Sequence, residues 1–326
     1  MFNQIKSQPK EYGVKIKNGG SSFSIEFPSS LTHPVFPMIH DMKSRIKHLK
    51  DLAIDYQVIS PWVDLFGYDL QETFLLNLSR LINDQNFLSV KEYPGKFSLL
   101  ATLPLPYSKA SSEELRYYVE EKGFDGCFIG TNINGTNLDS AVFDPLWSEA
   151  EKLDVPVYLH PSTLKFGNRL DKYYLENLIG NPLDTTIAAS SIILGGVLQR
   201  HKHLKIILSH GGGYLPFGIG RIDHGYLVRP ETSSTLENPP SSYISRFYYD
   251  SIVYRPSSLK LLLDVVSNKN IMLGTDYPFD MEPKDPSNVL IGNDANILRD
   301  VFYNNALSLF KNLKELVNVA EKGETS

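Results

Sequence analysis

The sequence predicts an α/β protein, specifically a TIM-type (β/α)8 barrel that lacks its first strand. From Asp51 onward, short apolar runs alternate with amphipathic helical stretches, which is the order expected of parallel β–α units. Three of these runs stop at His160, His210 or Asp276, and a Pro or Gly follows within two residues. Because barrel enzymes assemble their active sites at the carboxyl ends of strands, these three side chains are expected at one rim.

Seven apolar runs qualify as strands, one fewer than a closed barrel requires. The missing strand should precede Ile54, but residues 1–45 contain no apolar run of that kind. We therefore expect the chain to begin after its first barrel strand. In order, the predicted strands are Ile54–Ser60, Phe97–Leu103, Gly126–Gly130, Val155–His160, Ile206–His210, Phe247–Asp250 and Ile271–Thr275.

Three helices between the strands are predicted from periodicity and capping. Asp69–Ser89 carries Leu and Phe at helical spacing, and Phe143–Leu153 has one apolar stripe. Ser112–Lys122 is predicted as the third helix, with Ser111 and Ser112 offering N-cap chemistry at its start.

The two ends of the chain are expected to depart from the barrel pattern. Residues 1–45 form an incomplete N-terminal region, in which Phe23–Phe27 pairs with Gly13–Lys17 as an exposed β-hairpin insertion. Residues 294–326 form a C-terminal amphipathic helix and tail. No composition shift marks a boundary, so residues 1–326 are predicted as one domain of a size suited to a barrel.

Composition narrows the class of protein. The chain has 326 residues and a formal net charge of −5, so nothing in its balance points to nucleic acid or an anionic membrane. No apolar stretch approaches the roughly 20 residues of a membrane span, and the N-terminus lacks a secretory pattern. The single cysteine, Cys127, lies in an apolar run and suits a reducing compartment. We expect a cytoplasmic protein that acts on a small molecule.

The side chains at the three strand ends are suited to a divalent metal. Neutral imidazole and carboxylate bind Zn²⁺ and similar ions, and a catalytic site leaves one position open for water. Gly211–Gly213 directly after His210 removes side-chain bulk, which would let a substrate approach the backbone. Asp250 also ends a strand and is a candidate partner of a ligand. The literal His-x-His at His201–His203 precedes its strand, so we expect a solvated turn there.

Longer segments resemble the amidohydrolase-related family that contains aminocarboxymuconate semialdehyde decarboxylase and the resorcylate-type decarboxylases. The resemblance runs from about residue 40 to residue 310. The segments that carry it are Asp144-Pro-Leu-Trp147, Leu159-His-Pro161, Ser209-His-Gly-Gly-Gly213, Pro216-Phe-Gly-Ile-Gly-Arg-Ile-Asp-His-Gly225 and Leu273-Gly-Thr-Asp-Tyr-Pro-Phe279.

The resemblance implies a barrel with one divalent metal, usually Zn²⁺. His160 and Asp276 match the family's metal ligands, and His210 matches its acid/base histidine. Arg221 matches an arginine that reaches into the neighbouring subunit's site to bind a substrate carboxylate, which implies a homodimer. Trp62, just past the first predicted strand, is a candidate for substrate contact.

Two departures from the family's pattern qualify these expectations. The His-x-His pair that ends the family's first strand is not present, and we expect a truncated or mis-started reading frame rather than natural loss. With two or three ligands, the metal affinity of the chain as it stands should be reduced. The hairpin insertion also lacks the arginine of the semialdehyde decarboxylase, so that substrate is not assumed.

The predicted function is non-oxidative decarboxylation of an unsaturated or aromatic carboxylic acid by a metal-dependent carboxy-lyase. Metal-activated hydrolysis uses related chemistry, so a hydrolase of the same superfamily is the first alternative. The second alternative is a catalytically impaired barrel, because the N-terminal His-x-His is absent.

Overall fold

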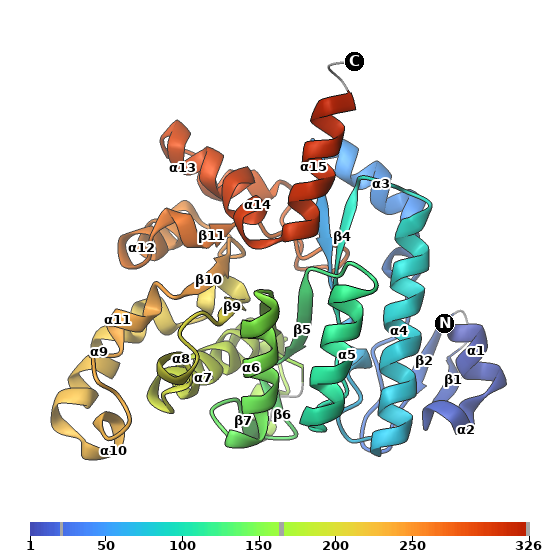
Figure 1. The fold of residues 1–326 in the computed structure, drawn as a ribbon, viewed down its shortest axis with the longest axis horizontal. Helices are drawn as coiled ribbons and strands as arrows, with labels where there is room; N and C mark the ends of the chain where they lie inside the picture. Colours follow the sequence, from blue (N-terminus) through green and yellow to red (C-terminus); the bar gives the residue numbers. More distant parts are fainter. Residues whose placement is uncertain (20–21, 163–165, 324–326) are drawn as a thin grey trace. The chain divides into compact units, whose positions relative to one another are not determined.

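A computed structural model describes residues 1–19, 22–162 and 166–323 (Figure 1). The chain forms two compact units. The first unit is Met1–Ile129 together with Lys311–Ser326, and the second is Gly130–Phe310. The division of residues 1–326 as a single barrel domain stays a prediction.

Three parallel strands form the centre of the first unit. β3 (Gln57–Ile59) pairs with β4 (Phe97–Ala101), and β4 pairs with β5 (Gly126–Gly130). Every residue of β4 and β5 is buried, as continuous apolar runs predict. The connecting helices α4 (Glu72–Lys91) and α5 (Ser108–Glu120) run side by side in Figure 1. Arg80 on α4 donates two hydrogen bonds to the Glu114 carboxylate on α5, at 3.0 and 2.6 Å.

The predicted hairpin is confirmed at the N-terminus of this unit. β1 (Lys15–Gly19) and β2 (Ser22–Glu26) pair antiparallel, and among the described residues before Gln57 they are the only strands. The expectation that the hairpin is exposed was wrong in part, because Ile25 on β2 is fully buried. Three short helices accompany it: α1 (Phe2–Ser7), α2 (Pro9–Tyr12) and α3 (Met42–Asp51).

The C-terminal helix α15 (Lys311–Gly323) is fastened to the first unit through its N-terminus. The Asp125 carboxylate accepts the backbone N–H groups of Asn312 and Leu313 at 2.7 and 3.1 Å, and it also accepts the Ser98 hydroxyl. A carboxylate in this place satisfies first-turn N–H groups that have no partner within the helix. Leu313 and Val317 are buried on one face of α15.

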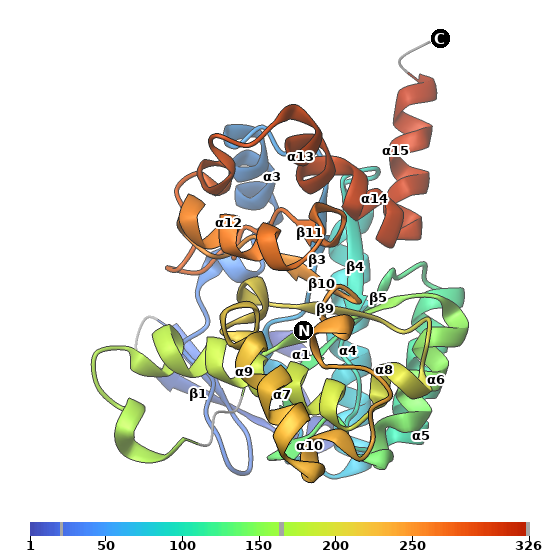
Figure 2. The same cartoon turned by 90° about the vertical axis from the view of Figure 1, so that its left-hand side faces the viewer.

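Four parallel strands form the centre of the second unit. They are β8 (Pro156–His160), β9 (Lys205–Leu208), β10 (Phe247–Asp250) and β11 (Ile271–Met272), hydrogen-bonded in that order. A small hairpin, β6 (Asn132–Ile133) and β7 (Thr136–Asn137), precedes them. In Figures 1 and 2, α9 (Leu215–Val228) runs beside α7 (Asn181–Leu194), and the two helices are in contact. The helices of this unit are α6 (Asp144–Leu153), α7 (Asn181–Leu194), α8 (Val197–Arg200), α9 (Leu215–Val228), α10 (Pro230–Ser233), α11 (Ser241–Ile244), α12 (Pro256–Val265), α13 (Ala295–Arg299) and α14 (Asn305–Leu309).

All seven predicted strands are present, but several boundaries were wrong. β9 ends at Leu208, so His210 lies in the turn after the strand rather than in the strand itself. β11 ends at Met272, three residues before the predicted end at Thr275, and Asp276 follows the strand as expected. Both residues have positive φ, at 56° and 58°, which an extended strand cannot accommodate.

Two helix predictions also needed correction. The helix predicted from Ser112 begins at Ser108, so Ser111 and Ser112 lie inside it, and the Ser112 hydroxyl donates to the Ser108 carbonyl. The predicted C-terminal helix from residue 294 is interrupted at Phe310, whose backbone is extended between α14 and α15. Residues 324–326 of the predicted tail lie outside the described residues.

Candidate active site

The segment after β9 turns sharply through four residues with positive φ. His210 has φ 56°, and Gly211, Gly212 and Gly213 have 59°, 77° and 63°. A Cβ at Gly211 would lie 2.4 Å from Val253 Cγ1, and one at Gly213 would lie 2.0 Å from the Pro182 carbonyl oxygen. The expectation that these glycines leave room for a substrate was therefore wrong. The protein's own atoms fill the space, and the glycines let the chain pack closely in a left-handed turn.

This turn brings the two predicted imidazoles together. The ring centroids of His160 and His210 are 4.9 Å apart, with the ring planes at 64°. His160 Nδ1 lies 2.7 Å from the Pro161 carbonyl oxygen. Because a carbonyl oxygen only accepts, Nδ1 carries the proton, and Nε2 of the neutral ring keeps its lone pair. Histidine ligands of metals usually have this arrangement.

Asp250, the last residue of β10, is buried under the His210 turn. Its Oδ2 accepts the backbone N–H of His210 and the hydroxyl of Tyr158, both at 2.9 Å. Its Oδ1 accepts the N–H groups of Gly211 and Ile252 at 2.8 and 3.0 Å. Burial raises the pKa of Asp250, although these four hydrogen bonds act in the opposite direction.

Burial also shifts the two remaining titratable groups of the predicted site. It raises the pKa of Asp276 to about 7, with further contributions from the carboxylates of Asp250, Glu282 and Asp280. It lowers the pKa of His210 to about 4, so the imidazole is neutral at pH 7. His210 Nδ1 is buried without a hydrogen-bond partner among the described residues.

Asp276 is linked to the paired imidazoles indirectly, through its effect on the pKa of Tyr158. Burial is the main cause that raises the pKa of Tyr158, but the nearby charges of Asp250 and Asp276 both add to it. Tyr158 precedes His160 by two residues on β8, so its side chain leaves the strand on the same face.

Arg221 and Trp62 are not part of this group of contacts. Arg221 is exposed on α9 and has no ion-pair partner among the described residues. Trp62 belongs to the first unit, where it is buried directly before a short 3₁₀ turn, Val63–Leu65. The substrate contacts expected of both residues stay predictions.

The comparisons with known proteins place the whole arrangement in one family. The amidohydrolase family model matches residues 37–311, well over half of the chain. A 2-amino-3-carboxymuconate-6-semialdehyde decarboxylase from Dictyostelium discoideum is 40% identical over 241 residues, which cover 73% of this chain and 67% of that protein. A gamma-resorcylate decarboxylase from Rhodococcus jostii is 28% identical, with 63% and 67% covered.

The fold has solved counterparts as well. A crystal structure of a dihydroxybenzoic acid decarboxylase from a Polaromonas species aligns with a TM-score of 0.74 at 23% identity, covering 82% of this chain and 85% of that one. That structure contains bound manganese and the inhibitor 2-nitroresorcinol. The chain belongs to the amidohydrolase family. The TIM-type α/β class and the resemblance to the decarboxylases of this family are confirmed.

The metal that amidohydrolase relatives bind can be tested against the donors of this chain. His160 Nε2 and the Asp276 carboxylate are suitable donor types. However, no group of three or more His, Cys, Asp or Glu side chains gathers anywhere in the described part of the chain. A catalytic zinc site takes three protein ligands. The described residues therefore include ligand types that suit the metal, but fewer ligands than a catalytic site requires.

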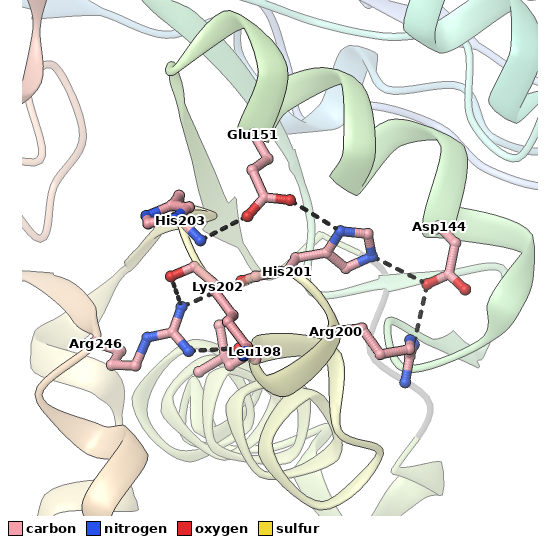
Figure 3. Close-up of polar contacts among 8 residues, drawn as sticks. All are labelled: Asp144, Glu151, Leu198, Arg200, His201, Lys202, His203 and Arg246. Carbon is pink, nitrogen blue, oxygen red and sulfur yellow. Dashed lines mark hydrogen bonds and ion pairs between the residues drawn. The ribbon is translucent and has the colours of Figure 1, made fainter.

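The literal His-x-His of this amidohydrolase chain packs against α6. His201 is 8% exposed and lies between two carboxylates of α6, with Nε2 3.5 Å from Asp144 and Nδ1 3.4 Å from Glu151 (Figure 3). Glu151 also accepts the backbone N–H of His203 at 2.6 Å. Both ring nitrogens of His201 thus face α6. The expectation of a solvated turn was wrong for His201 itself.

Tyr158 is the contact that reasoning from the sequence missed. Its signal was available, because a residue two positions before a candidate ligand on a strand shares its face. Asp250 was expected beside a metal ligand, whereas it holds the backbone of His210.

Proposed function

We propose that the chain is a non-oxidative decarboxylase of a small unsaturated or aromatic carboxylic acid. The observation that supports this best is the contact between His160, at the end of β8, and His210, in the turn after the adjacent strand β9, in a chain 40% identical to a decarboxylase. Further relatives, including the resorcylate enzymes, also carry decarboxylase names.

In this proposal His210 moves the proton. A non-oxidative decarboxylation adds one proton to the carbon that carries the carboxylate, breaks the C–C bond and releases CO₂, and the bonding electrons restore the unsaturated system. The His210 imidazole is neutral at pH 7, so in this step it would first take up a proton from solvent and then pass that proton to the substrate carbon as the carboxylate leaves as CO₂.

One divalent ion, Zn²⁺, belongs to the proposal, with His160 and Asp276 as ligands from this chain. If bound, such an ion would supply Lewis-acid polarisation of a substrate oxygen. The His160→Ala variant should lose metal measured by elemental analysis after gel filtration, whereas His210→Asn should retain it. Equal metal content in His160→Ala and the unchanged protein would contradict the ligand assignment.

The same proposal includes a homodimer, which Arg221 supports, and a cytoplasmic location. An exposed guanidinium without an ion-pair partner in the described chain can bind a carboxylate of a substrate held by a second copy. The described residues include no helix long and apolar enough to cross a membrane.

The experiment that tests the function compares two products. The protein is incubated with a panel of hydroxybenzoic acids and with matched esters and lactones, and released CO₂ and hydrolysed product are both measured. We expect the unchanged protein to release CO₂. In the His210→Asn variant, kcat for this reaction should fall by about 10²- to 10⁴-fold. Hydrolysis without CO₂ would favour the hydrolase alternative, and neither product would favour the impaired barrel.

A further inference from the structure

Asp250 receives more hydrogen bonds than its place at the end of a strand requires. Its two oxygens accept four donors, which come from His210, Gly211, Ile252 and Tyr158 at 2.8–3.0 Å. Only 6% of the residue is exposed, so these donors satisfy the carboxylate in place of water.

Two of these donors come from the most constrained part of the backbone. His210 and Gly211 have φ of 56° and 59°, and a non-glycine residue in the left-handed region is held there by its surroundings. Consecutive N–H groups in such a turn converge on one side and form a concavity that binds an anion. The anion here is the Asp250 side chain of the same chain, so the interaction holds the turn rather than a ligand.

The fourth donor connects Asp250 to the strand of the other imidazole. Tyr158 Oη donates to Asp250 Oδ2 at 2.9 Å, and Tyr158 shares its face of β8 with His160. Asp250 therefore accepts hydrogen bonds both from β8 and from the turn after β9. These two segments carry His160 and His210, whose ring centroids are 4.9 Å apart.

We propose that Asp250 is a positioning residue that holds the His210 turn so that its imidazole faces His160. The inference rests on the proposed role of His210 in proton transfer, and it adds a residue that acts through His210 rather than on the substrate. Loss of the carboxylate should reduce the rate of the chemical step, because a displaced imidazole transfers its proton less effectively.

The discriminating variant is Asp250→Asn, which keeps the size of the side chain. A carboxamide has one acceptor oxygen, so its NH₂ group would face two of the four donors. The matched control is Asp125→Asn in the first unit, because Asp125 is also a buried carboxylate that accepts two backbone N–H groups and one hydroxyl. With rates normalised to folded protein, we expect kcat to fall by roughly 10- to 100-fold in Asp250→Asn, with KM nearly unchanged. The control should keep its kcat.

A double variant separates positioning from a general loss of structure. If Asp250 acts through His210, then Asp250→Asn combined with His210→Asn should be no slower than His210→Asn alone. If the double variant instead loses kcat by the product of the two single-variant factors, the proposal is overturned. An unchanged kcat in Asp250→Asn would overturn it as well.

A readout that needs no turnover keeps the inference distinct from the function. In protein with ring-¹⁵N histidine, the His210 signals are identified by their loss in His210→Asn. They should shift in Asp250→Asn and remain in place in Asp125→Asn, and unchanged signals in both would overturn the proposal. If Asp250→Asn does not fold, Tyr158→Phe removes a single donor and should move the same signals. Absence of CO₂ release from every acid would count against the function alone, because the ring signals still decide the role of Asp250.

Discussion

At the scale of single residues, the candidate site depends on backbone conformations that most side chains avoid. His210 and Asp276 both have positive φ, and both come after strands of the same parallel group. Such conformations persist only where the surrounding structure stabilises them, and they cluster at active sites. Around His210 the stabilisation is visible in the hydrogen bonds to Asp250 and in three glycines that no larger residue could replace without strain.

Two glycine-to-alanine substitutions should change the free energy of unfolding in opposite directions. Gly213→Ala would place a Cβ 2.0 Å from the Pro182 carbonyl oxygen at φ 63°, and it should destabilise the fold by at least about 1–3 kcal/mol. Gly225→Ala lies inside α9 with open space around its Cβ, and it should stabilise the fold by roughly 0.5–1 kcal/mol. Urea unfolding of both variants measures the difference. Similar unfolding free energies for the two variants would contradict the described turn.

At the scale of elements, continuous apolar runs in the sequence predicted where the strands lie, but not the conformation of the loops after them. β5 and β10 have the predicted bounds because their runs are apolar up to a clear break. The end of β9 was misplaced because the left-handed conformation of His210 leaves no periodic trace in the sequence. The end of β11 was misplaced because the backbone N–H groups of Leu273 and Gly274 bond to Val301 and Ser251, outside the ladder. The hydrogen bonds from His210 to Asp250 and from Asn312 to Asp125 join residues 40 and 187 positions apart. Such partners arise only from tertiary packing.

The attachment of α15 through Asp125 leads to a second prediction. Asp125→Asn removes an acceptor from first-turn N–H groups of the helix, and it should lower the unfolding free energy by about 1–3 kcal/mol. Lys314→Gln, an exposed change on the same helix, serves as the control and should have little effect. Far-UV circular dichroism during urea unfolding measures both. An equal loss in the two variants would contradict the assigned cap.

The same carboxyl makes stability depend on pH in a defined direction. Burial raises the pKa of Asp125 above its usual value, although its hydrogen bonds act against this. The folded state therefore binds more protons than the unfolded state between the ordinary and the raised pKa. The contribution of Asp125 is fully present below the ordinary pKa and is lost as pH rises through the raised one. The advantage of the unchanged protein over Asp125→Asn should thus shrink from pH 4 upward, and an advantage that grows with pH would show the opposite sign.

At the scale of the whole molecule, the sequence was informative about family and fold, and less so about assembly. The motifs around His210 and Asp276 identify the family because they are long and specific, and the family model matches residues 37–311. Trp62 was chosen by its place after a predicted strand and Arg221 by its match to a family arginine, and neither has a described contact with the paired imidazoles. A residue that binds substrate in the site of a second copy of the chain makes no such contact within a single copy.

The exposed face of α9 makes the proposed homodimer testable. Phe217 is 82% exposed and Leu227 is 76% exposed, on the helix that also carries the exposed Arg221. Large apolar side chains in water favour association, so we expect light scattering to report a dimer and Phe217→Ser to increase the monomer fraction. Arg221→Gln should leave the dimer intact and raise KM for the carboxylate by roughly 10- to 100-fold, because charge-assisted hydrogen bonds are lost. A monomer with unchanged KM in Arg221→Gln would remove the guanidinium from the site, whereas a monomer with a raised KM would place it in the site of its own chain.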